Sequence, residues 1–112
     1  MSQINGKLRV VFMGTPTFAT PVLSALLDAG HDVVGVYTQP DKRVGRGGVV
    51  EPSPVKQFAL ERKLVVQQPE RLRDAGVQRG LEALLPDVCV VAAYGKLLPP
   101  EMLMIPPLGY IN

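Results

Sequence analysis

A chain of 112 residues with 46 % hydrophobic and 20 % charged side chains has the composition of one small folded domain, which excludes a disordered protein. Its formal net charge of +2 is too small to indicate a partner, so only local charge clusters are informative. The single cysteine, Cys89, cannot form an internal disulfide or a cysteine-based zinc site and favours a reducing, cytoplasmic setting. The longest apolar run, residues 88–93, is far too short to span a membrane.

Apolar runs alternate with helically spaced segments from the start of the chain. Residues 8–13 predict a buried strand that ends at the turn Gly14-Thr15-Pro16. Residues 18–29 carry apolar side chains at helical spacing and predict a helix that Gly30 terminates. Two residues are alternative N-caps of this helix, Thr17 and Thr20.

The second predicted strand, residues 33–37, leads into a long polar segment, residues 38–56. Proline, glycine and cationic residues dominate this segment, and a connection of this length and polarity is typical of a functional surface loop. At its tip Asp41 alone opposes three cations, which are Lys42, Arg43 and Arg46. Such a cluster suits a polyanionic partner such as the phosphates of a nucleic acid, and a solvated loop tip is the alternative.

The rest of the chain continues the alternation. The predicted elements are a helix over 54–63, a short strand over 64–66, a helix over 78–85, a strongly apolar strand over 88–92, and a proline-rich stretch over 97–108 that wraps the end of the sheet. Residues 109–112 have the pattern of a fifth strand that has only begun. We therefore expect the chain to be an N-terminal piece of a longer protein.

This order predicts an α/β fold, Rossmann-like, with a mostly parallel sheet, helices on both faces, and truncation before the full sheet is complete. Ligands of such folds bind outside the carboxyl ends of the strands. Those ends are Gly14-Thr15-Pro16, Thr38-Gln39-Pro40-Asp41 and Ala93-Tyr94-Gly95, and we expect the three segments to converge on one crevice.

Each of these segments also has an interpretation without a ligand. Gly14-Thr15-Pro16 could present backbone N–H groups to an anion or be a simple turn. Ala93-Tyr94-Gly95 could pair with the edge of a flat heterocycle, or be a glycine turn beside a packed tyrosine. One histidine, His31, and one cysteine cannot build a catalytic triad or a metal site, so no metal is expected.

Taken together, the segments resemble the methionyl-tRNA formyltransferase family from about Leu8 to Asn112. The resemblance rests on Val11-Phe12-Met13-Gly14-Thr15-Pro16, Phe18-Ala19, Tyr37-Thr38-Gln39-Pro40-Asp41, Gly45-Arg46-Gly47, Pro52-Ser53-Pro54-Val55-Lys56, Ala93-Tyr94-Gly95 and Gly109-Tyr110-Ile111-Asn112. It implies transfer of a formyl group from 10-formyltetrahydrofolate to the amino group of methionine on initiator methionyl-tRNA, in the cytoplasm and without a membrane.

The resemblance also implies roles for residues. Asn112 would donate its amide to the formyl oxygen as negative charge develops there. The folate pocket would be lined by Tyr94, Gly95, Lys96, Leu97 and Leu98. The methionyl-tRNA would be bound by Gly14, Thr15 and Phe18 near its methionyl end and by Lys42, Arg43 and Arg46 at its acceptor stem.

The family pattern continues beyond Asn112 with a catalytic histidine, a catalytic aspartate and a C-terminal tRNA-binding domain, which residues 1–112 lack. We therefore expect this N-terminal portion of the catalytic domain to be inactive alone and to self-associate through its uncovered sheet. The alternatives are a sibling folate-dependent formyltransferase acting on a sugar nucleotide, and a non-catalytic module that binds RNA or folate.

Overall fold

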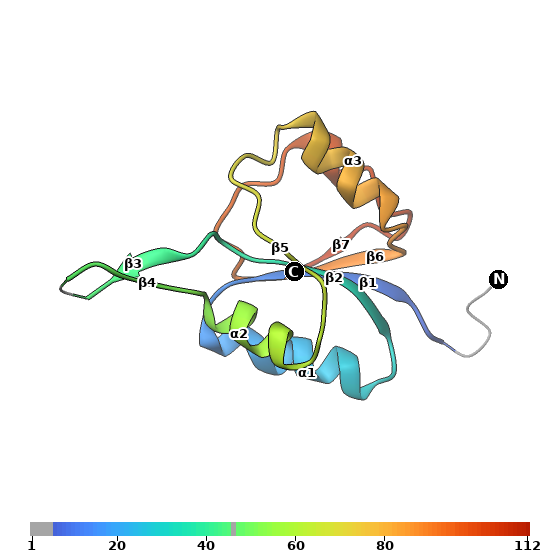
Figure 1. Ribbon diagram of the computed structural model, residues 1–112. Coiled ribbons are helices and arrows are strands. Elements are labelled where there is room, and N and C mark those ends of the chain that lie inside the picture. The colour runs from blue at the N-terminus through green and yellow to red at the C-terminus, as the bar shows by residue number, and fades with distance from the viewer. Residues whose placement is uncertain (1–5, 46) are drawn as a thin grey trace.

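The computed structural model describes residues 6–45 and 47–112 (Figure 1). Its elements in chain order are β1 (Arg9–Gly14), a 3-10 turn η1 (Thr17–Ala19), α1 (Thr20–Asp28), β2 (Asp32–Tyr37), β3 (Lys42–Val44), β4 (Val49–Glu51), α2 (Pro54–Glu61), β5 (Val66–Gln67), α3 (Ala75–Ala83), β6 (Val88–Ala92), α4 (Pro100–Leu103) and β7 (Tyr110–Ile111).

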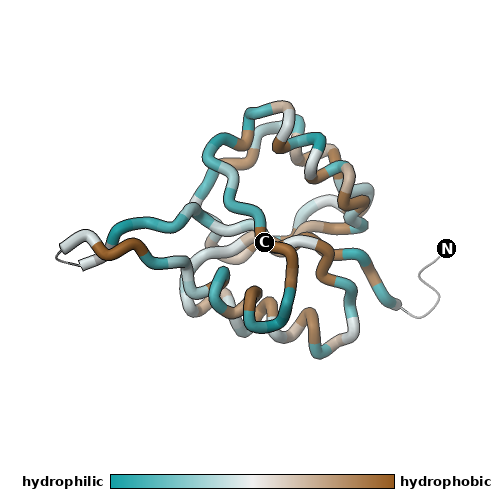
Figure 2. Tube along the Cα trace, viewed as in Figure 1, coloured by the Kyte–Doolittle hydropathy of each residue, from teal (hydrophilic) through white to brown (hydrophobic). Residues whose placement is uncertain are grey.

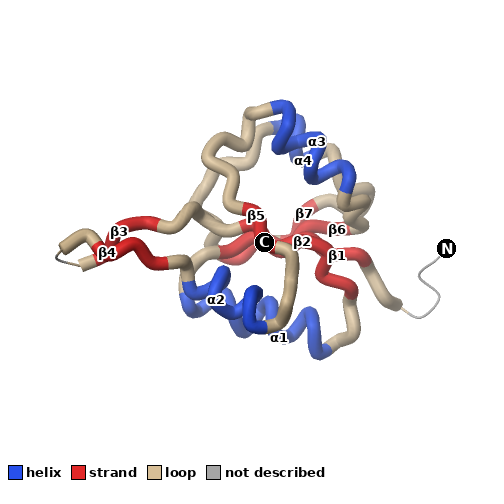
Figure 3. Tube along the Cα trace, viewed as in Figure 1, coloured by secondary structure: helices blue, strands red, loops and turns tan. Residues whose placement is uncertain are grey.

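Five strands form one parallel sheet in the order β5-β2-β1-β6-β7. The sheet lies between two helical layers, with α1 and α2 on one face and α3 and α4 on the other (Figures 1 and 3). The predicted α/β architecture with a parallel sheet and helices on both faces is therefore confirmed. Within these five strands β1 is central, and β6 lies directly beside it.

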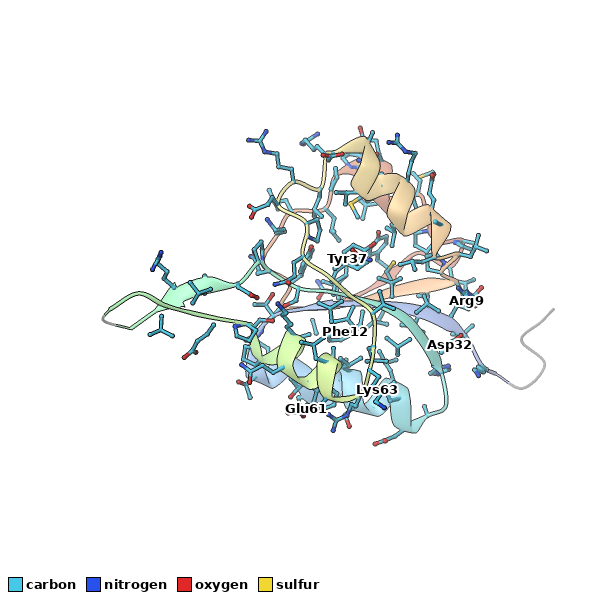
Figure 4. All side chains as sticks on the ribbon, viewed as in Figure 1. Arg9, Phe12, Asp32, Tyr37, Glu61 and Lys63 are labelled. Carbon is cyan, nitrogen blue, oxygen red and sulfur yellow. The ribbon has the colours of Figure 1, made fainter. Side chains whose placement is uncertain are left out.

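Two apolar cores cover the two faces of the sheet. Phe12 and Val36 pack with α1 and α2 residues, whereas Met13 and Tyr37 pack with Leu81 on the α3 side. Phe12 and Tyr37 accordingly point to opposite faces in Figure 4. Successive side chains of β1 and β2 point to opposite faces of the sheet, and both faces are buried. This is why these strands are apolar at nearly every position.

Local signals account for the ends of the helices. Gly30 has φ +85 and follows α1 in a Schellman arrangement, with the N–H of His31 bonded to the carbonyl of Leu26 and that of Gly30 to Leu27. Thr20 is the first residue of α1 and not its N-cap, and neither predicted N-cap is used, because Ala19 occupies that position. The Thr20 hydroxyl instead donates to the Thr17 carbonyl at 2.8 Å.

Several element boundaries differ from the sequence prediction. The segment 38–56 is not a continuous loop, because β3 and β4 pair antiparallel within it, and we call these two strands the ribbon. The helix α3 begins three residues early, since Asp74 caps it by accepting from the N–H of Gly76 at 2.8 Å. The strand β5 is confined to Val66–Gln67, and the stretch 97–108 contains an unpredicted short helix, α4.

The ribbon extends away from the three-layer body, beyond the carboxyl end of β2 (Figure 1). Its strands pair with each other and not with the five-stranded sheet. Figure 2 shows a hydrophilic β3 beside a partly hydrophobic β4. An isolated pair of three-residue strands is marginally stable in water, so the orientation of the ribbon must be determined at its base.

Candidate functional site

The three predicted segments do converge at the carboxyl edge of the sheet. The hydroxyl of Thr15 donates to the carbonyl of Tyr94 at 2.8 Å and accepts from the N–H of Gln39 at 3.4 Å. The Gln39 side-chain amide donates to the carbonyl of Gly95 at 2.9 Å. One hydroxyl and one amide thus tie the ends of β1, β2 and β6 together, which confirms that these segments lie side by side.

Tight backbone geometry makes this junction possible. A side-chain carbon at Gly14 would lie 2.7 Å from the Ala92 carbonyl oxygen and 2.8 Å from the Phe12 ring, so only glycine fits. After β6 the chain turns through Ala93 at φ +55 and Gly95 at φ +88, both in the left-handed region. Residues 93–95 therefore form the glycine turn that was one of the two interpretations of this segment.

The side chain of Tyr94 is buried in the core on the α3 side of the sheet. It is 2 % exposed, and its hydroxyl has no hydrogen-bond partner among the described residues. Burial raises the pKa of Tyr94 well above its ordinary value. The Tyr94 backbone carbonyl, bonded to Thr15, is the part of this residue that lies at the junction.

The neighbouring segment 96–98 borders a hollow of about 660 Å³. Lys96 donates its ammonium to the carbonyl of Glu70 at 2.9 Å, and the Leu98 side chain packs against the core. Leu97 is 96 % exposed beside this hollow. Glu70, Arg71 and Arg73 also line it, so the wall combines exposed apolar surface with an excess of cations over the one carboxylate.

Cationic side chains emerge from the ribbon. Lys42 and Arg43 lie on β3 and are exposed, and the Arg43 guanidinium donates to the carbonyl of Gly48 at 2.6 Å across the turn. Gly45 and Gly48 have φ of +66 and +67, which explains why the turn requires glycine. The prediction for Arg46 concerns a residue outside the described part of the chain.

A second hollow, of about 340 Å³, lies between the body and the ribbon. Thr15 and Pro16, just after β1, line it together with Lys42 of β3 and Ser53, the N-cap of α2. Phe18 follows on η1 with 72 % of its surface exposed. An aromatic side chain this exposed leaves apolar surface available to a partner.

The base of the ribbon contains a polar cluster that the sequence analysis did not identify. The ammonium of Lys56 lies 3.0 and 3.1 Å from the two carboxylate oxygens of Asp41, and the Gln68 amide donates to Asp41 at 2.7 Å. Hydrogen bonds from Gln68 and Lys56 hold the pKa of Asp41 below its ordinary value. The Ser-Pro pair at 53–54, an N-cap followed by a first-turn proline, was the sequence signal that α2 begins here.

Asn112 is exposed and follows β7, whose Ile111 lies opposite Val90 of β6 in a parallel register. Asn112 is therefore at the same edge of the sheet as Gly14 and Ala92, where β1 and β6 end. The structure brings Thr15 together with Tyr94 and Gly95, whereas Phe18 and the ribbon cations stand further out as exposed side chains.

Among residues 6–45 and 47–112, no group of three histidine, cysteine, aspartate or glutamate side chains is placed to hold a metal ion. No helix within the same ranges is long and apolar enough to cross a membrane.

A family model described as formyl transferase matches residues 7–112. This chain belongs to the formyl transferase family. The formyl transferase chain is 58 % identical over 105 residues to a methionyl-tRNA formyltransferase of Pseudomonas fluorescens (strain SBW25), and 49 % identical over 105 residues to that of Alkaliphilus oremlandii (strain OhILAs). Each match covers 94 % of this chain and 33 % or 34 % of the relative, so the chain spans about a third of the length of these curated relatives. The resemblance found in the sequence is confirmed.

Solved structures support the fold of this formyl transferase chain. A glycinamide ribonucleotide transformylase from Symbiobacterium toebii superposes with a TM-score of 0.68 at 14 % identity, covering 93 % of this chain and 50 % of that one. A phosphoribosylglycinamide formyltransferase from Bacillus halodurans gives 0.64 at 16 % identity, covering 87 % of this chain and 50 % of the other. At such low identity the likeness shows only that the fold is shared.

Proposed function

We propose that residues 1–112 are the N-terminal portion of the catalytic domain of an enzyme that formylates the amino group of initiator methionyl-tRNA, with 10-formyltetrahydrofolate as the donor. The observation that carries this proposal is the identity of 49–58 % to methionyl-tRNA formyltransferases from different bacteria. Identity to the structurally similar enzymes named for glycinamide substrates is only 14–16 %, which favours the tRNA substrate. The buried free thiol of Cys89 is consistent with a cytoplasmic setting for this reaction.

In this proposal the ribbon binds the acceptor stem. Lys42 and Arg43 are exposed on a strand pair that stands clear of the body, and Arg46 extends the same basic sequence. Cations on a protruding ribbon can approach the phosphates of an RNA helix without a clash between the helix and the sheet. Thr15 and the exposed Phe18 contribute the surface for the methionyl end near the hollow of about 340 Å³, and the buried Gly14 ends the strand that leads to them.

The folate would occupy the hollow of about 660 Å³. Leu97 and Leu98 offer apolar surface to its rings, and the cations Lys96, Arg71 and Arg73 suit the carboxylates of its glutamyl part. The carbonyls of Tyr94 and Gly95 already accept hydrogen bonds from Thr15 and Gln39. We therefore assign these two residues to shaping the pocket wall, with Lys96, Leu97 and Leu98 as the contacting residues.

Asn112 supplies the electrophilic assistance in this proposal. As the methionyl nitrogen attacks the formyl carbon, the side-chain N–H of Asn112 stabilises the negative charge on the formyl oxygen. The bond between the formyl carbon and the folate nitrogen then breaks, the folate nitrogen takes up a proton as tetrahydrofolate leaves, and the attacking amine gives up a proton of its own. That proton needs a base, and in this proposal the histidine and aspartate of the family pattern supply it from outside residues 1–112.

The two binding functions can be tested separately. We expect Arg43→Ala to weaken binding of an initiator-tRNA acceptor-stem hairpin and to reduce the slope of log K against log salt by about one unit. Lys96→Ala should weaken binding of 10-formyltetrahydrofolate and leave RNA binding unchanged. Isothermal titration calorimetry with each ligand measures both effects, and thermal melting checks that the variants fold.

Three results would contradict the proposal. If either variant binds neither the hairpin nor 10-formyltetrahydrofolate, the mutated segment has only a structural role. Binding of neither ligand by the wild-type chain would contradict both site assignments. Tight binding of a sugar nucleotide without any affinity for RNA would instead favour a sibling formyltransferase.

We further propose that the isolated chain self-associates along β7. This edge strand is short, and Ile111 and Leu108 beside it are 58 % and 62 % exposed. Exposed backbone and apolar side chains at a sheet edge favour pairing with a second copy. Light scattering should therefore show a mass above that of one chain, and a monodisperse monomer would contradict this part of the proposal.

A further inference from the structure

The ribbon is joined to the body by a compact set of polar contacts that converge on Asp41. Asp41 directly precedes β3 and receives hydrogen bonds from two other parts of the chain. Lys56, in the first turn of α2, contributes its ammonium at 3.0 and 3.1 Å, and Gln68, just after β5, contributes its amide at 2.7 Å. The same Gln68 amide lies 3.3 Å from the carbonyl of Gln39.

The chain that returns from the ribbon is fixed at the same place. Ser53 caps α2 by accepting from the backbone N–H of Lys56 at 3.0 Å. The Ser53 hydroxyl also lies 2.6 Å from that of Thr38, a fully buried residue that follows β2. The segment that leaves β2 at Thr38 and the segment that returns from β4 at Ser53 are therefore both tied to the start of α2.

The charge of Asp41 is unfavourable for the function proposed above unless it has another role. A carboxylate next to Lys42 and Arg43 reduces the positive potential that attracts phosphates. Every hydrogen bond shown for the Asp41 carboxylate goes to the body and none to the ribbon cations. The geometry thus makes Asp41 part of the attachment of the ribbon and not part of its charged surface.

We propose that Asp41, Lys56 and Gln68 form a clamp that fixes the direction of the ribbon relative to the sheet, which makes Asp41 a positioning residue for the binding of an RNA stem. The inference rests on the proposed function, because it takes RNA as the ligand of the ribbon. The ribbon strands have no partner in the main sheet, so an intact clamp holds Lys42 and Arg43 in a defined place relative to the hollow beside Thr15. Without it the same cations remain present but lose their common orientation.

Replacing Asp41 should change the RNA affinity in one direction if the clamp matters and in the opposite direction if only charge matters. Removing the Asp41 carboxylate, which lies next to the ribbon cations, should tighten binding to a polyanion if only the potential matters. If the clamp matters, Asp41→Ala should instead weaken binding about threefold to tenfold at 0.1 M salt, the loss that corresponds to about one phosphate contact. The variant itself therefore distinguishes the two explanations.

Glu51 provides the matched control. It lies opposite Lys42 in the ribbon, is exposed, and takes no part in the Asp41 cluster. Glu51→Ala removes the same charge at nearly the same place, and we expect binding equal to or tighter than wild type. Lys56→Ala should reproduce the loss seen in Asp41→Ala, and the double variant should lose no more than the weaker-binding single variant, because both remove the same contact.

Two readouts on the 112-residue chain decide the proposal. The first is the affinity for an acceptor-stem hairpin, measured by fluorescence anisotropy. The second, which needs no RNA, is the NMR order parameter of the backbone amides of β3 and β4. We expect it to be about 0.85 in wild type and Glu51→Ala, as in rigid backbone, and to fall below about 0.6 in Asp41→Ala.

Tighter RNA binding in Asp41→Ala, similar to that in Glu51→Ala, would overturn the clamp, as would unchanged order parameters of the ribbon amides. If the wild-type chain binds no RNA, the proposed function fails. The order parameters then still show whether the three residues hold the ribbon.

Discussion

The sheet body and the ribbon are encoded by opposite kinds of sequence. In the body, β1, β2 and β6 are apolar at nearly every position, and Phe12 and Met13 are fully buried. In the ribbon, Lys42, Arg43 and Val50 are exposed, and glycines at positive φ form the turn. Burial specifies the body, whereas the ribbon depends on hydrogen bonds at its base. The segment best suited to bind a partner is thus the one that contributes least to the stability of the fold.

The largest contrast should come from truncating one large apolar side chain in each region. Phe12→Ala removes a ring that is 0 % exposed and should lower the free energy of unfolding by about 3–5 kcal/mol. Val50→Ala, at a side chain 55 % exposed on the ribbon, should change it by less than about 0.5 kcal/mol. Urea unfolding followed by circular dichroism measures both values. Equal losses would mean that the ribbon packs against the body in solution.

Two glycines sharpen the comparison within the body itself. Gly14→Ala forces a methyl group against the Ala92 carbonyl and the Phe12 ring and should destabilise the chain by about 1–3 kcal/mol. Gly80→Ala in α3 is the control, because a side-chain carbon there meets nothing within 4 Å, and it should stabilise the chain by about 0.4–1 kcal/mol. Thermal melting of the two variants should therefore shift in opposite directions. A stabilising effect of Gly14→Ala would contradict the close approach of β1 and β6.

The contrast also explains how much the sequence alone predicts. The apolar runs of β1, β2 and β6 were identified to within one residue, because a strand buried on both faces leaves an uninterrupted pattern. The convergence of Thr15, Gln39 and Gly95 followed from the topology, since parallel strands end at one edge. The ribbon was not predicted, because its pairing is local and its side chains give no alternation between buried and exposed faces. The direction of the Tyr94 side chain was also left open, since it depends on the left-handed turn at Ala93.

The joint between the two regions should respond to a smaller change. Ser53→Ala removes the N-cap of α2 and the partner of the buried Thr38 hydroxyl, and should cost about 1 kcal/mol, with roughly 2 as an upper value. Ser53→Thr keeps the hydroxyl and serves as the control. Hydrogen exchange at the Lys56 amide should accelerate in the alanine variant. Unchanged protection of that amide would contradict the capping role.

A shift of pH should separate the two regions at opposite ends of the pH scale. Burial raises the pKa of Tyr37 to about 12 and that of Cys89 to about 11. Because these folded-state values exceed the ordinary 10.0 and 9.0, the fold favours the neutral forms. The resulting stability is present below the ordinary values and is lost as pH rises toward 11 and 12. Alkali should therefore unfold the body.

Strong acid should weaken the contacts at the base of the ribbon. Hydrogen bonds from Gln68 and Lys56 lower the pKa of Asp41 below its ordinary 3.8, so its contribution is present above that value and is lost as pH falls through the lowered one. All three tyrosines have raised pKa values, and none lies in the ribbon. Absorbance should thus report tyrosinate only together with loss of circular dichroism, while a urea-unfolded control titrates near 10. Early tyrosine ionisation in a still folded chain would contradict the burial that distinguishes the body from the ribbon.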